Sequence, residues 1–99
     1  MLKYTLSPNA ASSIADINAY TIKKFGPQQA ERYMANFRDR FKFLMTHPEL
    51  GIDRHDIKKG YYCYFEGSHT IYYKVVDDHI AIIDILHQSM EPTHHLSDE

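Results

Sequence analysis

The chain has 99 residues, 43% of them hydrophobic, and its 11 Lys and Arg against 13 Asp and Glu give a formal net charge of −2. This length predicts one domain over residues 1–99 with a modest core. The only cysteine, Cys63, excludes an internal disulfide and favours a reducing compartment. The negative charge argues against a protein whose affinity comes from phosphate contacts, since such proteins usually carry a basic excess.

Two further classes of protein are disfavoured by simple patterns. No apolar run approaches the roughly 20 residues of a membrane span, and the N-terminus lacks a signal-peptide pattern. We therefore expect a cytoplasmic protein without membrane contact. The seven histidines show no His-x3-His spacing, and no Cys-x2-Cys pair exists, so we expect no metal.

The N-terminal part predicts a strand followed by a helix. Residues 2–6 alternate apolar and polar side chains with a period of two, as in a half-buried strand. Ser7 can cap a helix, and Pro8 at its first position loses no hydrogen bond. Apolar residues then recur every three or four positions up to Phe25, which predicts an amphipathic helix that Gly26 ends.

A second amphipathic helix is predicted to begin at Pro27. It should end near Thr46, because the residue before Pro48 is pushed out of the helical conformation. So short a junction forces the two helices into an antiparallel hairpin. Residues 47–59 then form a long loop, and loops of this length are more often functional or mobile than neutral.

Three strands are predicted after the loop. Residues 61–65, 69–76 and 79–86 are aromatic and β-branched runs joined by short turns. The last run is apolar on both faces and should be central, with residues 2–6 beside it. The predicted fold is therefore α+β, in the order β-α-α-β-β-β, with the helical hairpin on one face of a small antiparallel sheet. The polar residues 92–99 are expected to fray.

The C-terminal third of the chain contains its most family-specific sequence motifs. Gly-Ser-His at 67–69 precedes an Ile-Tyr-Tyr strand, and residues 86–91 read Leu-His-Gln-Ser-Met-Glu. With the upstream segments in order, the chain resembles the ParE toxins of bacterial type II toxin–antitoxin pairs, one branch of the RelE/ParE superfamily. The resemblance covers nearly the whole chain. Its upstream segments are 16–20, 25–30 and 47–51.

The resemblance implies a toxin that is not an enzyme, needs no cofactor and holds DNA gyrase in its DNA-cleaved state. It also implies a ParD-like antitoxin that dimerises and binds its operator through a ribbon-helix-helix. That antitoxin wraps a disordered C-terminal segment around the toxin, so the toxin reaches operator DNA only indirectly. The C-terminal segment and the helix junction supply the candidate gyrase-binding residues His87, Gln88, Ser89, Met90, Glu91 and Phe25. Alternatively, Phe25 has no role in binding and is only the last apolar residue of its helix.

Candidate antitoxin contacts are aromatic residues of the hairpin and of the sheet. Alternation places Tyr62 and Tyr64 on the side of the sheet opposite Tyr61 and Phe65. Exposed tyrosines are amphipathic and enriched at interfaces. The alternative is their partial burial by the loop 47–59. The candidate antitoxin-binding residues are Tyr20, Tyr33, Phe37, Tyr62 and Tyr64.

Two rival functions remain open. The first is a ribosome-dependent endoribonuclease of the RelE type. In that case His87, which we place on the same strand face as Ile83 and Ile85, would act as a general acid or base. The predicted strands disfavour it because Lys74 is their only cation, and Tyr62 stands where many ParE relatives have Arg. The second is a non-toxic co-repressor that binds its antitoxin.

Overall fold

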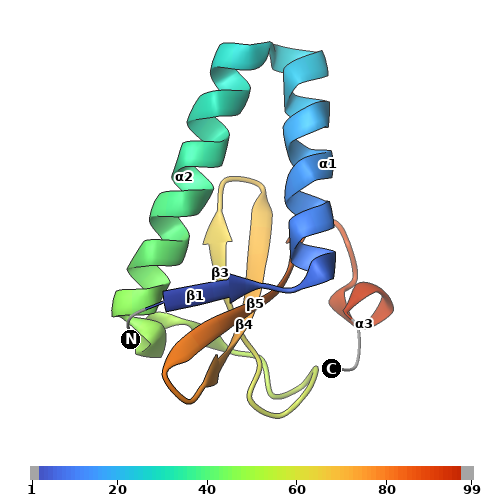
Figure 1. Ribbon diagram of the computed structural model, residues 1–99. Helices are drawn as coiled ribbons and strands as arrows, with labels where there is room; N and C mark the ends of the chain where they lie inside the picture. The colour runs from blue at the N-terminus through green and yellow to red at the C-terminus, as the bar shows by residue number, and fades with distance from the viewer. Residues whose placement is uncertain (1–2, 97–99) are drawn as a thin grey trace.

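The structure, a computed structural model, describes residues 3–96 (Figure 1). The predicted α+β fold is confirmed, and the predicted helices and strands lie within a residue or two of their expected bounds. Three short elements were not predicted, namely a 3-10 turn, the two-residue strand β2 and the short helix α3. In chain order the elements are β1 Lys3–Leu6, α1 Pro8–Phe25, α2 Pro27–Thr46, a 3-10 turn at Pro48–Leu50, β2 Ile52–Asp53, β3 Tyr62–Glu66, β4 His69–Val76, β5 His79–His87 and α3 Pro92–His95.

Both long helices begin and end where their sequence signals predict. The Ser7 hydroxyl oxygen accepts the Ala10 N–H at 3.0 Å, so it caps α1. Gly26 takes a φ of 91°, a conformation that glycine adopts without steric cost, and separates α1 from α2. Neither helix is apolar enough to cross a membrane within the part of the chain that the structure describes.

The sheet has the strand order β1-β5-β4-β3-β2, so β5 is paired on both sides as predicted. Strands β3, β4 and β5 form an antiparallel meander, whereas β1 pairs with β5 in parallel, with Tyr4 opposite Ile80. The expectation of an antiparallel sheet therefore needs a correction, because the sheet is mixed. The reason is topological: the α1–α2 hairpin returns the chain to the end where β1 began, so β3 and β5 run in the direction of β1 (Figure 1).

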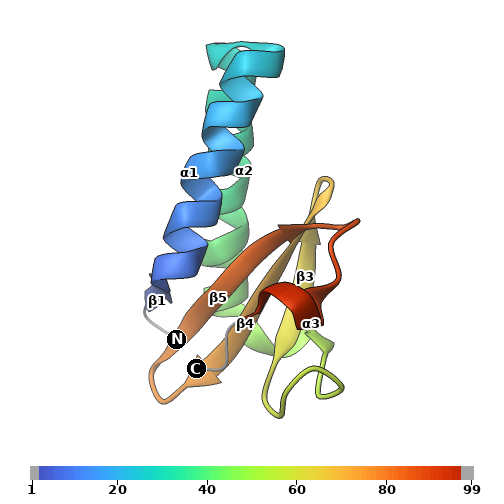
Figure 2. The same cartoon turned by 90° about the vertical axis from the view of Figure 1, so that its right-hand side faces the viewer.

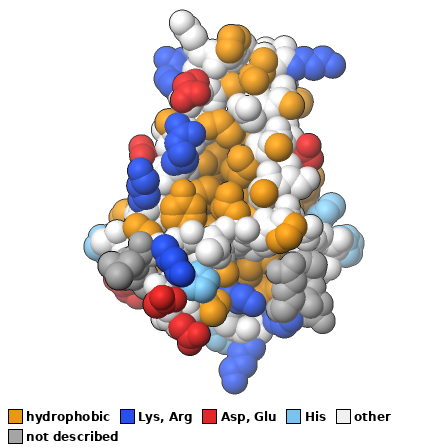
Figure 3. Space-filling view, in the orientation of Figure 1, with side chains coloured by type: hydrophobic (Ala, Val, Ile, Leu, Met, Phe, Trp, Pro, Cys, Tyr) orange, Lys and Arg blue, Asp and Glu red, His pale blue; other side chains and the backbone are white. Residues whose placement is uncertain are grey.

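The main core lies between the helical hairpin and one face of the sheet. Phe37, Phe41 and Leu44 of α2 are buried there against five aliphatic and aromatic side chains of β4 and β5. Hydrophobic side chains also gather between the two helices (Figure 3). The tip of the hairpin extends past the sheet (Figures 1 and 2), and its residues Tyr20 and Phe25 are exposed.

A second, smaller core lies on the opposite face of the sheet. Its buried members are Tyr61, Cys63, Tyr72, Ile83 and Leu86, and they pack against half-buried hydrophobic residues of the 54–60 loop and of the C-terminal segment. Figure 2 views the sheet from the side on which α3 lies. Both faces are therefore covered, which corrects the expectation of a single covered face.

The C-terminal segment also departs from its prediction. Residues 92–95 form α3 instead of fraying, and Leu96 packs on the second core. The Leu96 N–H donates to the Pro92 carbonyl at 2.9 Å and closes the helical turn. Residues 97–99, part of the same prediction, lie outside the described residues.

Candidate functional site

A groove of about 660 Å³ lies between α1, α2, the β3–β4 turn and the segment after β5. It brings together residues from both predicted sets. Tyr20 and Tyr33, predicted for the antitoxin, share it with Phe25, His87 and Met90, predicted for gyrase. Residues far apart in the sequence thus form one surface.

The outer end of the groove is apolar and carries one positive charge. Tyr20 is 58% exposed, Phe25 61% and Met90 44%. The Lys24 ammonium donates to the Tyr20 hydroxyl at 3.0 Å and lies 5.6 Å from the centre of the Phe25 ring. Exposed aromatic side chains beside a cation are typical of protein-contact surfaces.

The inner end of the groove is held by a tyrosine and two histidines. The Tyr33 hydroxyl lies 2.6 Å from His69 Nδ1, and the His69 ring meets the His87 ring edge-on at 5.4 Å. Burial, together with the nearby His87, lowers the pKa of His69. His69 is therefore neutral at pH 7, and in the tautomer protonated at Nε2 its Nδ1 accepts a hydrogen bond from the Tyr33 hydroxyl.

The segment after β5 is anchored to the β3–β4 turn. The Gln88 backbone N–H donates to the Ser68 carbonyl at 2.9 Å, and its side-chain amide donates to the Gly67 carbonyl at 3.1 Å. His87 Nδ1 accepts the Ser89 N–H at 3.1 Å. These bonds fix the turn that carries Met90 at the rim of the groove.

His87 lies on the helix side of the sheet together with Ile85, but Ile83 does not share this face. The pairing of β4 and β5 shifts register between Tyr72 and Tyr73, opposite Ile83. As a result, Ile83 belongs to the second core and Ile85 to the main core. The predicted common face for Ile83, Ile85 and His87 is therefore wrong for Ile83.

Three predicted antitoxin contacts lie away from the groove. Phe37 is 1% exposed and packs in the main core, which removes it from the candidate contact residues. Tyr62 and Tyr64 are half-buried on the same face, against Tyr73 and Phe43 respectively. The alternative of partial burial thus describes these two tyrosines, although helix α2 contributes to it as well as the loop.

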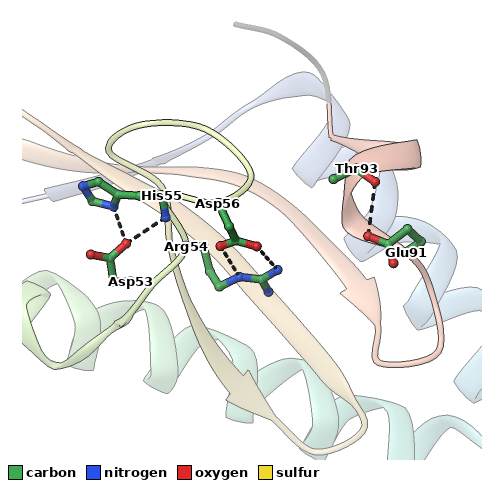
Figure 4. Close-up of polar contacts among 6 residues, drawn as sticks. All are labelled: Asp53, Arg54, His55, Asp56, Glu91 and Thr93. Carbon is green, nitrogen blue, oxygen red and sulfur yellow. Dashed lines mark hydrogen bonds and ion pairs between the residues drawn. The ribbon is translucent and has the colours of Figure 1, made fainter.

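The arginines nearest the sheet are tied to acidic partners. Arg54 donates through Nε and Nη2 to the two carboxylate oxygens of Asp56, each at 3.0 Å (Figure 4). Arg40 Nε lies 3.1 Å from a Glu66 carboxylate oxygen. Among residues 3–96, no three His, Cys, Asp or Glu side chains converge as a metal site.

Sequence reasoning missed Lys24 and His69 as members of the groove. Lys24 lies one helical turn after Tyr20, a spacing that alone predicts their contact. His69 becomes visible only through strand pairing, because its position opposite His87 depends on the register of β4 and β5.

Comparison with known proteins places the chain in a family. Residues 4–92 match the family model described as "ParE toxin of type II toxin-antitoxin system, parDE". The protein "Toxin ParE1" of Caulobacter vibrioides is 32% identical over 96 residues, which cover 97% of this chain and 99% of that protein. "Toxin ParE1" of Mycobacterium tuberculosis is 31% identical over 90 residues, covering 90% and 92%.

A solved structure shares the fold. The structure titled "Chromosomal ParDE TA system from P. aeruginosa" matches with a TM-score of 0.74 at 18% identity, covering 88% of this chain and 96% of that chain. The family match spans most of the chain, and the relatives match over nearly their full length. The chain therefore belongs to the ParE toxin family of type II toxin–antitoxin systems.

Proposed function

We propose that the chain poisons DNA gyrase without catalysing a reaction, and that a ParD-like antitoxin neutralises it by filling the groove. The observation that carries the proposal is the shared groove. Tyr20 and Tyr33 line it beside Phe25, His87 and Met90. An antitoxin segment bound there covers the residues expected to reach gyrase, so neutralisation acts by occlusion.

The composition of the groove suits a partner segment that folds as it binds. Such a segment loses conformational entropy on ordering, so it needs a large apolar surface in return. Tyr20 and Phe25 of the hairpin and Met90 of the segment after β5 are 44 to 61% exposed along the groove. A ribbon-helix-helix protein with an amphipathic C-terminal segment fits this requirement.

The endoribonuclease alternative finds little support in the charges of the sheet. Cleavage of a phosphodiester needs cations that hold the phosphate and a group that moves a proton. Lys74 is the only Lys or Arg in strands β3 to β5. Arg40 and Arg54, which lie near the sheet, are held in ion pairs. His69 is neutral and occupied by Tyr33. These contacts favour a toxin that acts by binding.

Purified gyrase and supercoiled plasmid test the proposal. With the chain present, linear plasmid should accumulate after the reaction is stopped with detergent and protease, and supercoiling should fall. A translation extract run in parallel should retain intact message. Cleaved message on the ribosome with unaffected gyrase would establish the endoribonuclease instead. Normal growth during expression of the chain would favour the non-toxic co-repressor.

A further inference from the structure

A second pocket of about 370 Å³ adjoins the groove. It lies between α1, β5 and the C-terminal segment, and its lining includes Ser13, Asp16, Asp84 and His87. Asp16, His87 and Met90 line both depressions, so they form one continuous surface. No Lys or Arg of the described chain lines the pocket.

The pocket contains a buried carboxylate with an unused oxygen. Asp84 is 6% exposed, and its Oδ1 accepts the Ser13 hydroxyl at 2.6 Å and the Ile85 N–H at 2.8 Å. Both of these bonds go to Oδ1, and no buried side-chain oxygen of residues 3–96 lacks a partner, so Asp84 Oδ2 is open to the pocket. An accessible carboxylate oxygen can accept a hydrogen bond from a charged donor, which is stronger than a bond between neutral groups.

The charges along the surface differ from one end to the other. The carboxylates of Asp16 and Asp84 line the pocket, whereas Lys24 lies at the outer end of the groove. Carboxylates disfavour a phosphate or a nucleic acid in the pocket and favour a cation. A metal ion is a poor fit because no three potential ligands converge in the described part of the chain. An organic cation on a flexible stem matches the site better.

We propose that the pocket receives an Arg or Lys side chain of the antitoxin, while apolar side chains of the same segment fill the groove. The inference rests on the proposed function and adds the chemistry by which the toxin selects its partner. The basic side chain donates to Asp84 Oδ2, with Asp16 adding a second negative charge. The Lys24 end then favours an acidic residue of the partner, so the charges also fix the direction of the bound segment.

Asp84→Asn tests this contact with little disturbance of the fold. The amide oxygen accepts the same bonds from Ser13 and Ile85, and only the group facing the pocket changes from an acceptor to a donor. Asp39→Asn, on the exposed surface of α2 and outside both depressions, makes the same charge change as a control.

The probe is the full-length cognate antitoxin, and its binding to the toxin is measured by titration calorimetry. Asp84→Asn should weaken binding about tenfold or more, which corresponds to about 1.4 kcal/mol. Asp39→Asn should stay within about threefold, about 0.7 kcal/mol on the same scale. Each Lys and Arg in the C-terminal half of the antitoxin is then changed to Gln. One of these changes should weaken binding to the unaltered toxin but have little further effect on Asp84→Asn.

Each other outcome overturns the inference. Tight binding that Asp84→Asn leaves unchanged removes the basic contact but keeps the proposed function. The same holds if no basic residue of the antitoxin is coupled to Asp84. If Asp84→Asn reduces only the trapping of gyrase, the basic side chain belongs to gyrase. If the unaltered toxin does not bind the antitoxin, the proposed function fails as well.

Discussion

Tyr20 offers a direct test of the groove because more than half of its surface is exposed in the free toxin. It is 58% exposed, and its hydroxyl accepts a hydrogen bond from Lys24 on the helix surface. An aromatic side chain buries about 200 Å² when fully covered, so about 115 Å² remains available to a partner. At about 25 cal/mol per Å², covering that area contributes up to about 3 kcal/mol, or roughly 100-fold in affinity.

Tyr20→Ala should therefore weaken antitoxin binding by between about 10-fold and 100-fold, because the antitoxin covers part or all of that area. The free energy of unfolding should change by no more than about 0.5 kcal/mol, as for other surface substitutions. Calorimetric titration with the antitoxin measures the first quantity, and urea unfolding measures the second.

Phe65→Ala is the matched control for Tyr20→Ala. Phe65 is 50% exposed and does not line the groove. Its replacement should leave antitoxin affinity within about twofold, about 0.4 kcal/mol. The reasoning is refuted if Tyr20→Ala binds the antitoxin as tightly as the unaltered chain, or if both variants lose the same affinity.

Three further predictions address the tail, the buried histidine and nucleic acid. Deleting residues 88–99 should abolish gyrase trapping, which a gyrase cleavage assay measures. It should also lower the free energy of unfolding by about 2–3 kcal/mol, because Leu96 is removed from the second core and the Gln88 bonds are lost. Urea unfolding measures this second effect. The lowered pKa of His69 means that the unfolded chain binds a proton that the folded chain excludes, so stability should fall as pH drops from about 7 to 5. In His69→Gln that slope should flatten, and an unchanged slope would point to another group. Finally, gel shifts with the toxin alone should give a dissociation constant of about 10⁻⁴ M or weaker for RNA and duplex DNA at physiological salt. Tight binding that weakens steeply with salt would instead support the endoribonuclease hypothesis.

Local signals in the sequence predicted the helices well. The Ser7-Pro8 start and the Gly26-Pro27 junction each act within a few residues, so their outcome depends little on the rest of the fold. Strand β2 escaped prediction because its two residues, Ile52 and Asp53, are defined by pairing with β3. Such pairing depends on contacts that are distant in sequence.

The candidate site was predictable only in part. Tyr20 and Tyr33 were predicted from their place on the apolar stripes of the two helices, and both line the groove. The stripe of Tyr33 also contains Phe37, which the sheet buries completely. A helical period shows which residues share a face and not which of them lie beyond the edge of the sheet. Asp84 gave no signal either, because a single acid in an apolar strand becomes notable only once it is seen to be buried against Ser13.

The central claim is that one groove serves both partners, and competition tests it most directly. Gyrase, plasmid and toxin are brought to a steady level of cleaved DNA, and antitoxin is then added in steps. The account predicts that linear plasmid disappears as antitoxin reaches one site per toxin, and that the Tyr20→Ala toxin needs more antitoxin for the same effect. Cleaved DNA that persists when the toxin is saturated with antitoxin would show that gyrase binds elsewhere, and would contradict the account.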